Sequence, residues 1–146
     1  MAYLFLLAGY FRSTKGYSRA LQAFGKLPKG RAELWIVGDY KKTERNLEFK
    51  RDLLADIRNC RGKVRLFRRI YSSERYHRFF EEADCVLLPY EAGPHEDILN
   101  DAVLHGNKPV IASDLPGFVR YAQKSKSAVI VHDDAELLAA MLNPIS

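Results

Sequence analysis

Two loops of this chain combine residue types that can bind an anion and a sugar. The first runs from Gly9 to Gly16 and carries Arg12 and Lys15, directly before a segment with the apolar period of a helix. Free N–H groups at the start of a helix attract anions, so this loop can hold a phosphate. It contains neither Gly-x-Gly-x-x-Gly nor Gly-Lys-Ser/Thr, and an ordinary strand-to-helix turn with exposed cations explains it equally well.

The second loop, 89–101, gathers acidic residues at the expected start of a helix near His95. Asp101 lies one helical turn after Asp97, where a carboxylate can accept hydrogen bonds from ribose hydroxyls. Glu96 and Asp97 are equally expected from the helix dipole alone. His95 can contact a phosphate, although a histidine that caps a helix or faces solvent is the more common case.

Several other chemistries have no support in the sequence. The chain has no Asp-x-Asp, and His77, His105 and His132 lack the spacing of metal ligands. Gly-x-Ser-x-Gly is also absent. We therefore expect no metal and no cofactor, and we assign no catalytic residue.

A basic stretch within 61–78 accounts for the net charge of +5. It consists of Arg61, Lys63, Arg65, Arg68, Arg69, Arg75 and Arg78. An anionic partner and a merely solvated face both explain it. Nucleic acid is disfavoured because no aromatic-interleaved basic motif occurs, whereas peripheral association with a membrane remains open.

The composition indicates one globular domain. The chain has 146 residues, of which 47% are hydrophobic and 28% charged. The apolar N-terminal segment, Met1 to Phe11, is shorter than the ~20 residues that span a bilayer. Cys60 and Cys85 lie far apart, which indicates free thiols in a reducing compartment such as the cytoplasm.

Short apolar runs alternate with helix-period segments along the whole chain. The runs predict six strands at Tyr3–Ala8, Glu33–Val37, Lys63–Phe67, Cys85–Leu88, Pro109–Ala112 and Ala128–Val131. Helices are expected to begin near Gly16 and after a cap at Ser72 or Ser73, and to cover about Glu44–Cys60, Ile98–Val103 and Phe118–Gln123. A last helix is expected after a capping box formed by Asp133 and Glu136, and it should bury Leu137, Leu138 and Met141. This alternation predicts a doubly wound, Rossmann-like parallel sheet with strand order 3-2-1-4-5-6. Ligands bind where that order reverses, between strands one and four, which is where both loops begin.

The order of these pieces resembles the C-terminal, nucleotide-sugar-binding domain of GT-B glycosyltransferases of family 4, the group 1 transferases. The resemblance covers nearly the whole chain. It is carried by Lys15-Gly16 after the first strand, by Ala83 to Pro89 at the fourth, and by Asp101-Ala102 at the second glutamate of the family signature. Residues Lys108 to Ser113 then resemble its Gly-x-Pro-Val strand.

The resemblance implies a site for the donor of a metal-independent glycosyl transfer, with a UDP- or GDP-type sugar as substrate. By this match Lys15 binds the diphosphate, Asp101 the ribose, and the backbone around Pro94 to Asp97 the sugar and phosphates. The donor-binding residues expected in this way are Gly9, Arg12, Lys15, Gly16, Glu91, Pro94, His95, Glu96, Asp97 and Asp101. It also implies that residues 1–146 form this domain without the acceptor-binding half, so that either a separate protein supplies that half or the chain is a fragment of a longer enzyme.

Two positions depart from the family pattern, and one extra residue stands before Pro109. Gly93 stands where the first signature glutamate belongs, and Tyr10 stands where an arginine usually follows the first glycine. Glu91 or Glu96 can replace the first, and Arg12 the second. These departures keep open a non-catalytic module that binds a nucleotide or a protein partner. An NAD-type oxidoreductase is disfavoured because its glycine fingerprint is missing.

Overall fold

A computed structural model describes residues 2–39, 47–69, 71–92, 98–99 and 107–146. The six strands are β1 (Tyr3–Ala8), β2 (Ala32–Gly38), β3 (Lys63–Arg68), β4 (Cys85–Leu88), β5 (Val110–Ser113) and β6 (Ala128–Val131). The helices are α1 (Tyr17–Gly25), α2 (Leu47–Asn59), α3 (Ser73–Glu82), α5 (Pro116–Lys124) and α6 (Asp134–Leu142), with 3-10 turns at Ser13–Lys15 and Asn143–Ile145. Of the helix expected over Ile98–Val103, only Ile98 and Leu99 are described, and both are helical and buried.

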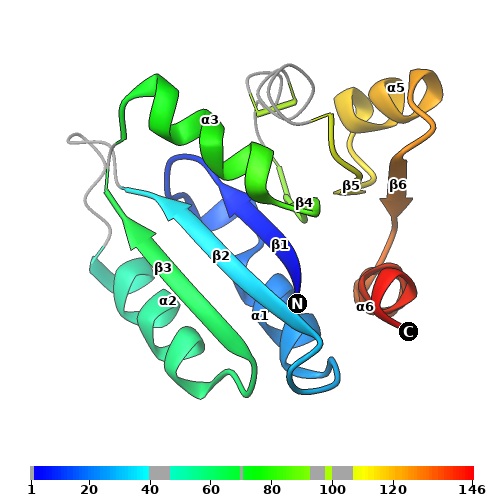
Figure 1. The fold of residues 1–146 in the computed structure, drawn as a ribbon. Coiled ribbons are helices and arrows are strands. Elements are labelled where there is room, and N and C mark those ends of the chain that lie inside the picture. The colour runs from blue at the N-terminus through cyan, green and yellow to red at the C-terminus, as the bar shows by residue number, and fades with distance from the viewer. Residues whose placement is uncertain (1, 40–46, 70, 93–97, 100–106) are drawn as a thin grey trace.

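All strand pairs are parallel, and the sheet order is β3-β2-β1-β4-β5-β6. The predicted order is therefore confirmed, with β3 and β6 at the two edges of the sheet (Figure 1). Element ends differ from the prediction by a residue or two; the fifth strand, for example, begins at Val110 and not at Pro109. Proline cannot donate to the ladder, which favours the later start.

The alternation of side chains along β1 divides the core into two layers. Phe5 and Leu7 pack on one face of the sheet, with residues of α1, α2 and α6. Leu6 and Ala8 pack on the other face, with residues of α3 and α5. These four residues are at most 1% exposed, as a strand covered on both faces requires.

The caps of α3 and α6 are formed by the expected residues, but the carboxylate of the α6 capping box has a different partner. Ser72 Oγ accepts a hydrogen bond from Arg75 N, and Asp133 Oδ1 accepts one from Glu136 N. The Glu136 carboxylate, however, accepts from the N–H of His132 at 3.2 Å, one residue before the cap. Leu138 is only half-buried, so the last helix buries less apolar surface than predicted.

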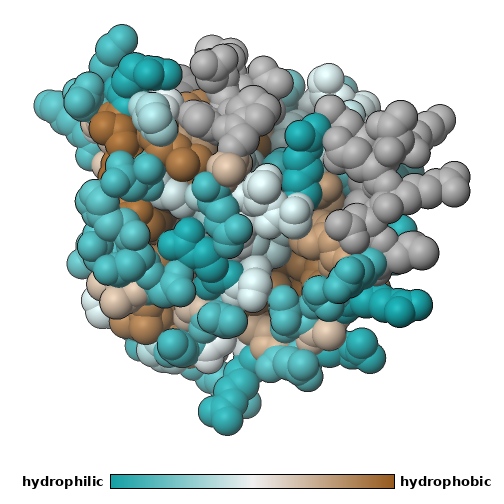
Figure 2. All heavy atoms as spheres, turned by 180° about the vertical axis from the view of Figure 1, so that it is seen from behind, coloured by the Kyte–Doolittle hydropathy of each residue, from teal (hydrophilic) through white to brown (hydrophobic). Residues whose placement is uncertain are grey.

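The surface away from the viewer of Figure 1 is mostly hydrophilic (Figure 2). Apolar residues appear there only as separate patches between polar side chains. Among the described residues, no helix is both long and apolar enough to cross a bilayer.

Candidate anion-binding site

The loops after β1 and β4 touch each other at the carboxyl end of the sheet. Glu91 N donates a hydrogen bond to Thr14 O at 2.7 Å. At Gly16, where φ is +75°, an added Cβ would collide with the carbonyl oxygen of Pro89. The two loops chosen from topology therefore form one seam, closed by backbone contacts that leave no space for a side chain at position 16.

A second backbone contact holds the start of the first loop against β2. Gly9 N donates to Val37 O at 3.0 Å, and Phe11 N donates to Asp39 O at 3.1 Å. Gly38, with φ +150°, has no room for a Cβ because the carbonyl oxygen of Gly9 fills that space. The first loop is thus fixed on both sides, by β2 and by the loop after β4.

This double anchoring turns Lys15 back over the end of β1. Lys15 ends a short 3-10 turn, in which its N–H donates to Arg12 O at 3.2 Å. Its ammonium packs against Gly9, where any side chain would occupy the same space. Gly9 has φ +126°, a conformation that favours glycine, and the absence of a side chain there lets the Lys15 ammonium come close to the backbone.

Tyr90 is a site residue that the sequence analysis missed. Its ring lies 5.5 Å from Lys15 Nζ, within cation–π range, and contacts the ring of Phe118 at 5.5 Å. Tyr90 is only 3% exposed. A tyrosine after the proline of a buried strand is a weak signal, because only the three-dimensional contact shows what it touches.

The hydroxyl of Tyr90 is buried and has no hydrogen-bond partner among the described residues. Burial raises the pKa of this phenol far above its ordinary value, so the group remains neutral. Ser113 Oγ, at the carboxyl end of β5, is likewise buried without a described partner. Neutral buried hydroxyls therefore lie at or just after the carboxyl ends of two neighbouring strands, and the Tyr90 ring lies beside the Lys15 ammonium.

Half of the predicted donor-binding residues can be located. The structure brings Gly9, Lys15, Gly16 and Glu91 together at the seam. Arg12 belongs to the same loop and is half-buried. Pro94, His95, Glu96, Asp97 and Asp101 lie outside the described residues, so the predicted meeting of Lys15 with Asp101 stays a prediction.

Two of the cavities that described residues line bear on the choice of site, and neither is lined by Arg12 or Lys15. The smaller, of about 390 Å³, borders Gly16 and Glu91 but is also lined by Asp52 and Asp56. Burial and the neighbouring Asp52 raise the pKa of Asp56. A lining with three carboxylates, those of Asp52, Asp56 and Glu91, disfavours a phosphate in this cavity.

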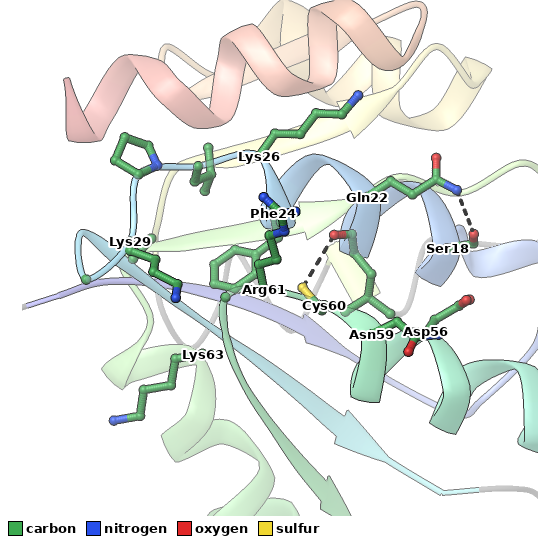
Figure 3. A pocket seen from close by; sticks show the side chains of 17 residues that line it. Ser18, Gln22, Phe24, Lys26, Lys29, Asp56, Asn59, Cys60, Arg61 and Lys63 are labelled. Carbon is green, nitrogen blue, oxygen red and sulfur yellow. Dashed lines mark hydrogen bonds between the residues drawn. The ribbon is translucent and has the colours of Figure 1, made fainter.

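The larger cavity, of about 960 Å³, lies at the opposite end of the sheet, between the last turns of α1 and α2 (Figure 3). Its cations, including Lys26, Lys29 and Lys63, point in different directions and do not converge on one point. Cys60 Sγ lies there, 3.6 Å from Leu21 O. None of the five donor-binding residues that the structure describes lines this cavity.

The remaining reactive groups do not form a second chemical site. Both cysteines are free thiols, and burial raises the pKa of Cys85 to about 12, so it is not a thiolate nucleophile. Within the described ranges, no cluster of three His, Cys, Asp or Glu residues has the geometry of a metal site.

The fold and the seam can now be compared with known proteins. Residues 2–146 match the profile of the family described as "Glycosyl transferases group 1". The chain therefore belongs to this family. No curated protein matches the sequence significantly.

Solved structures share the fold at low sequence identity. A UDP-forming α,α-trehalose-phosphate synthase from Burkholderia xenovorans has a TM-score of 0.83 at 14% identity, over 96% of this chain and 36% of its own. WaaG, a glycosyltransferase involved in lipopolysaccharide biosynthesis, has a TM-score of 0.77 at 20% identity, over 99% of this chain and 38% of its own. A sucrose-phosphate synthase from Thermosynechococcus elongatus has a TM-score of 0.77 at 20% identity, over 97% and 36%. This chain thus spans little more than a third of the length of each of these three proteins.

Proposed function

We propose that this chain binds the diphosphate of a nucleotide-sugar donor at the seam between the loops after β1 and β4, and that it serves glycosyl transfer. The observation that carries the proposal is the placement of the Lys15 ammonium, which the Gly9 backbone and the Tyr90 ring hold at the point where the strand order reverses. Membership of the group 1 glycosyltransferases supports the same reaction class.

Lys15 has a defined role in this proposal. When the bond between the sugar and the diphosphate breaks, negative charge develops on the departing phosphate oxygens. A fixed ammonium beside those oxygens stabilises the transition state more than the ground state, because it does not have to reorganise as the charge develops. The proposed step uses this cation and the N–H groups of the loop as stabilising groups.

An acceptor must also be held in place for transfer to occur. Orienting two reactants together can supply ~7–11 kcal/mol of a reaction barrier, so a separate acceptor-binding half is part of the proposal. The donor class is a uridine or guanosine diphosphate sugar. Because the trehalose-phosphate synthase that shares this fold is UDP-forming, uridine diphosphate is the first ligand to test.

Isothermal titration calorimetry with UDP and GDP tests the site. Lys15→Ala removes one charged partner of the diphosphate and should weaken binding about 10- to 100-fold, the effect of losing a hydrogen bond to a charged group. Lys29→Ala is the matched control, because it removes the same charge from an exposed position in the cavity at the other end of the sheet. Equal affinity of Lys15→Ala and wild type would refute the site, and failure of the wild-type protein to bind either diphosphate would refute the function.

A further inference from the structure

Besides Arg61 and Arg75, the basic stretch contains two groups of cations that differ in their contacts. Three of its cations are held by carboxylates: Lys63 by Glu33 at 3.7 Å, Arg68 by Asp39 at 3.5 Å, and Arg78 by Glu74 at 2.8 Å. Arg65 and Arg69 instead lie over aromatic rings and form no ion pair with a described residue. Their charges are therefore available to an outside partner.

Arg65 and Arg69 mark the two ends of a continuous aromatic row. The Arg65 guanidinium lies 5.6 Å from the Trp35 ring and 5.0 Å from the Phe67 ring. The row continues through Phe79, whose ring is 5.1 Å from Phe67 and 5.1 Å from Tyr71. The Arg69 guanidinium then lies 5.5 Å from Tyr71. These six residues are called the arginine–aromatic row below.

The four rings of the row belong to the core layer that contains the α3 residues Tyr76 and Phe80. Figure 1 shows α3 beside β3, the edge strand that carries Arg65 and Phe67. Arg65 is paired in register with Trp35, so both project from the same face of the sheet. All four rings are half-buried, whereas Arg65 and Arg69 are exposed. Cations on an edge strand can serve merely to block pairing with another strand. That explanation covers Lys63 and Arg65 but not Arg69, which follows the strand and stacks on a ring.

We propose that the arginine–aromatic row is a docking surface for a membrane that contains anionic phospholipids. An arginine stacked on a ring keeps the edge of its planar guanidinium open, and that edge pairs with phosphate oxygens through two parallel hydrogen bonds. Trp and Tyr beside such cations suit the boundary between headgroups and acyl chains. The surface does not depend on the donor site, and it can be tested without a nucleotide.

The same geometry disfavours two other anionic partners. Single-stranded nucleic acid would stack its bases on open ring faces. Here the rings use their faces and edges on one another, with interplanar angles of 58–83° between Phe79 and its three aromatic neighbours, Trp35, Phe67 and Tyr71. An acidic peptide would fit a groove, yet Arg65 and Arg69 line neither of the two cavities described above. A broad lipid surface needs no such groove.

Flotation with lipid vesicles tests this surface. Wild-type protein should bind vesicles of phosphatidylcholine mixed with phosphatidylglycerol and should not bind vesicles of phosphatidylcholine alone. The double variant Arg65→Gln/Arg69→Gln should bind the mixed vesicles about 30-fold more weakly, since each basic residue near an anionic membrane contributes about one kcal/mol. Lys124→Gln/Lys126→Gln is the matched control, because it removes two exposed charges elsewhere and should bind like wild type.

Circular dichroism of each variant shows whether the fold is kept. Should the glutamine variant not fold, the wild-type protein still decides: its binding to mixed vesicles should disappear at 1 M salt, where the Debye length is about 3 Å. Equal binding to both kinds of vesicle, or no binding, would overturn the proposal. It would also be overturned if the two arginines proved necessary for binding polyuridylic acid while vesicles were not bound.

Discussion

The two ends of the sheet differ in how their cations are held. At the carboxyl end, the Lys15 ammonium packs against Gly9 and the Tyr90 ring. At the amino end there is a cavity of about 960 Å³, but Lys26 and Lys29 extend from its rim as exposed side chains. The cations at the amino end are therefore less firmly positioned than the Lys15 ammonium at the carboxyl end.

Helix direction explains the cations at the amino end without a ligand. α1 ends at Gly25 and α2 at Asn59, and the last turn of a helix carries partial negative charge. Lys26 and Arg61 follow these two ends and stabilise them. At the carboxyl end, in contrast, Lys15 precedes α1, where the helix dipole repels a cation. A lysine that is kept in an unfavourable field by packing is the stronger sign of a binding function.

The largest effect that separates the two ends is expected from a pair of glycine substitutions. Gly16→Ala introduces a Cβ at φ +75° that collides with the carbonyl oxygen of Pro89, and it should lower the free energy of unfolding by about 3–5 kcal/mol. Gly30→Ala, at φ +80° near the amino end, meets no atom within 4 Å and should cost about 1–2 kcal/mol. Urea unfolding measures both. Equal costs would mean that the seam is loose and that the two ends do not differ.

A smaller effect is expected at Tyr90. Tyr90→Phe removes a buried hydroxyl that has no described partner but keeps the ring beside Lys15, so the free energy of unfolding should rise by about 1 kcal/mol. Affinity for a nucleoside diphosphate should stay unchanged in this variant. Tyr90→Leu removes the ring and should weaken that affinity about 2- to 30-fold, the range of a cation–π contact. A loss of stability in Tyr90→Phe would show that the hydroxyl makes a hydrogen bond.

Sequence periodicity predicts the scaffold well because each strand and helix is encoded locally. The run Tyr3–Ala8 is apolar at every position, and that pattern alone identifies a strand covered on both faces. Right-handed crossovers then restrict the strand order. The ends of the strands are less certain, since a residue such as Pro109 can extend a run in the sequence without joining the ladder.

The arrangement of the site is harder to predict because it depends on contacts between distant residues. Gly16 and Pro89 are far apart in the chain, and nothing near either residue indicates that one backbone will exclude a side chain from the other. The same holds for Lys15 and Tyr90. The basic stretch also shows what the sequence cannot predict. Its seven cations are evident from the sequence, but only the fold shows that Arg78 forms an ion pair and that Arg65 stacks on aromatic rings.

The smallest predicted effect concerns a histidine at the carboxyl end of the sheet. His132 follows β6, and its Nδ1 lies 2.9 Å from Glu136 Oε1, while its Nε2 lies 3.5 Å from Asp114 Oδ2. The contact with Glu136, followed by the charges of Glu136, Asp114 and Asp133, raises the pKa of His132 above its ordinary value near 6.5. The exposed ring makes the stability effect slight.

The sign of this effect follows from proton linkage. Because the pKa is higher in the folded than in the unfolded protein, the imidazolium adds stability below about pH 6.5, and that contribution is lost as the pH rises through the folded pKa. Titration of the His132 ring by NMR should give a midpoint above 6.5, and Glu136→Gln should lower it. The small decline in stability with rising pH across this window should vanish in His132→Gln. A midpoint that Glu136→Gln leaves unchanged would contradict the assignment of Glu136 as the main cause.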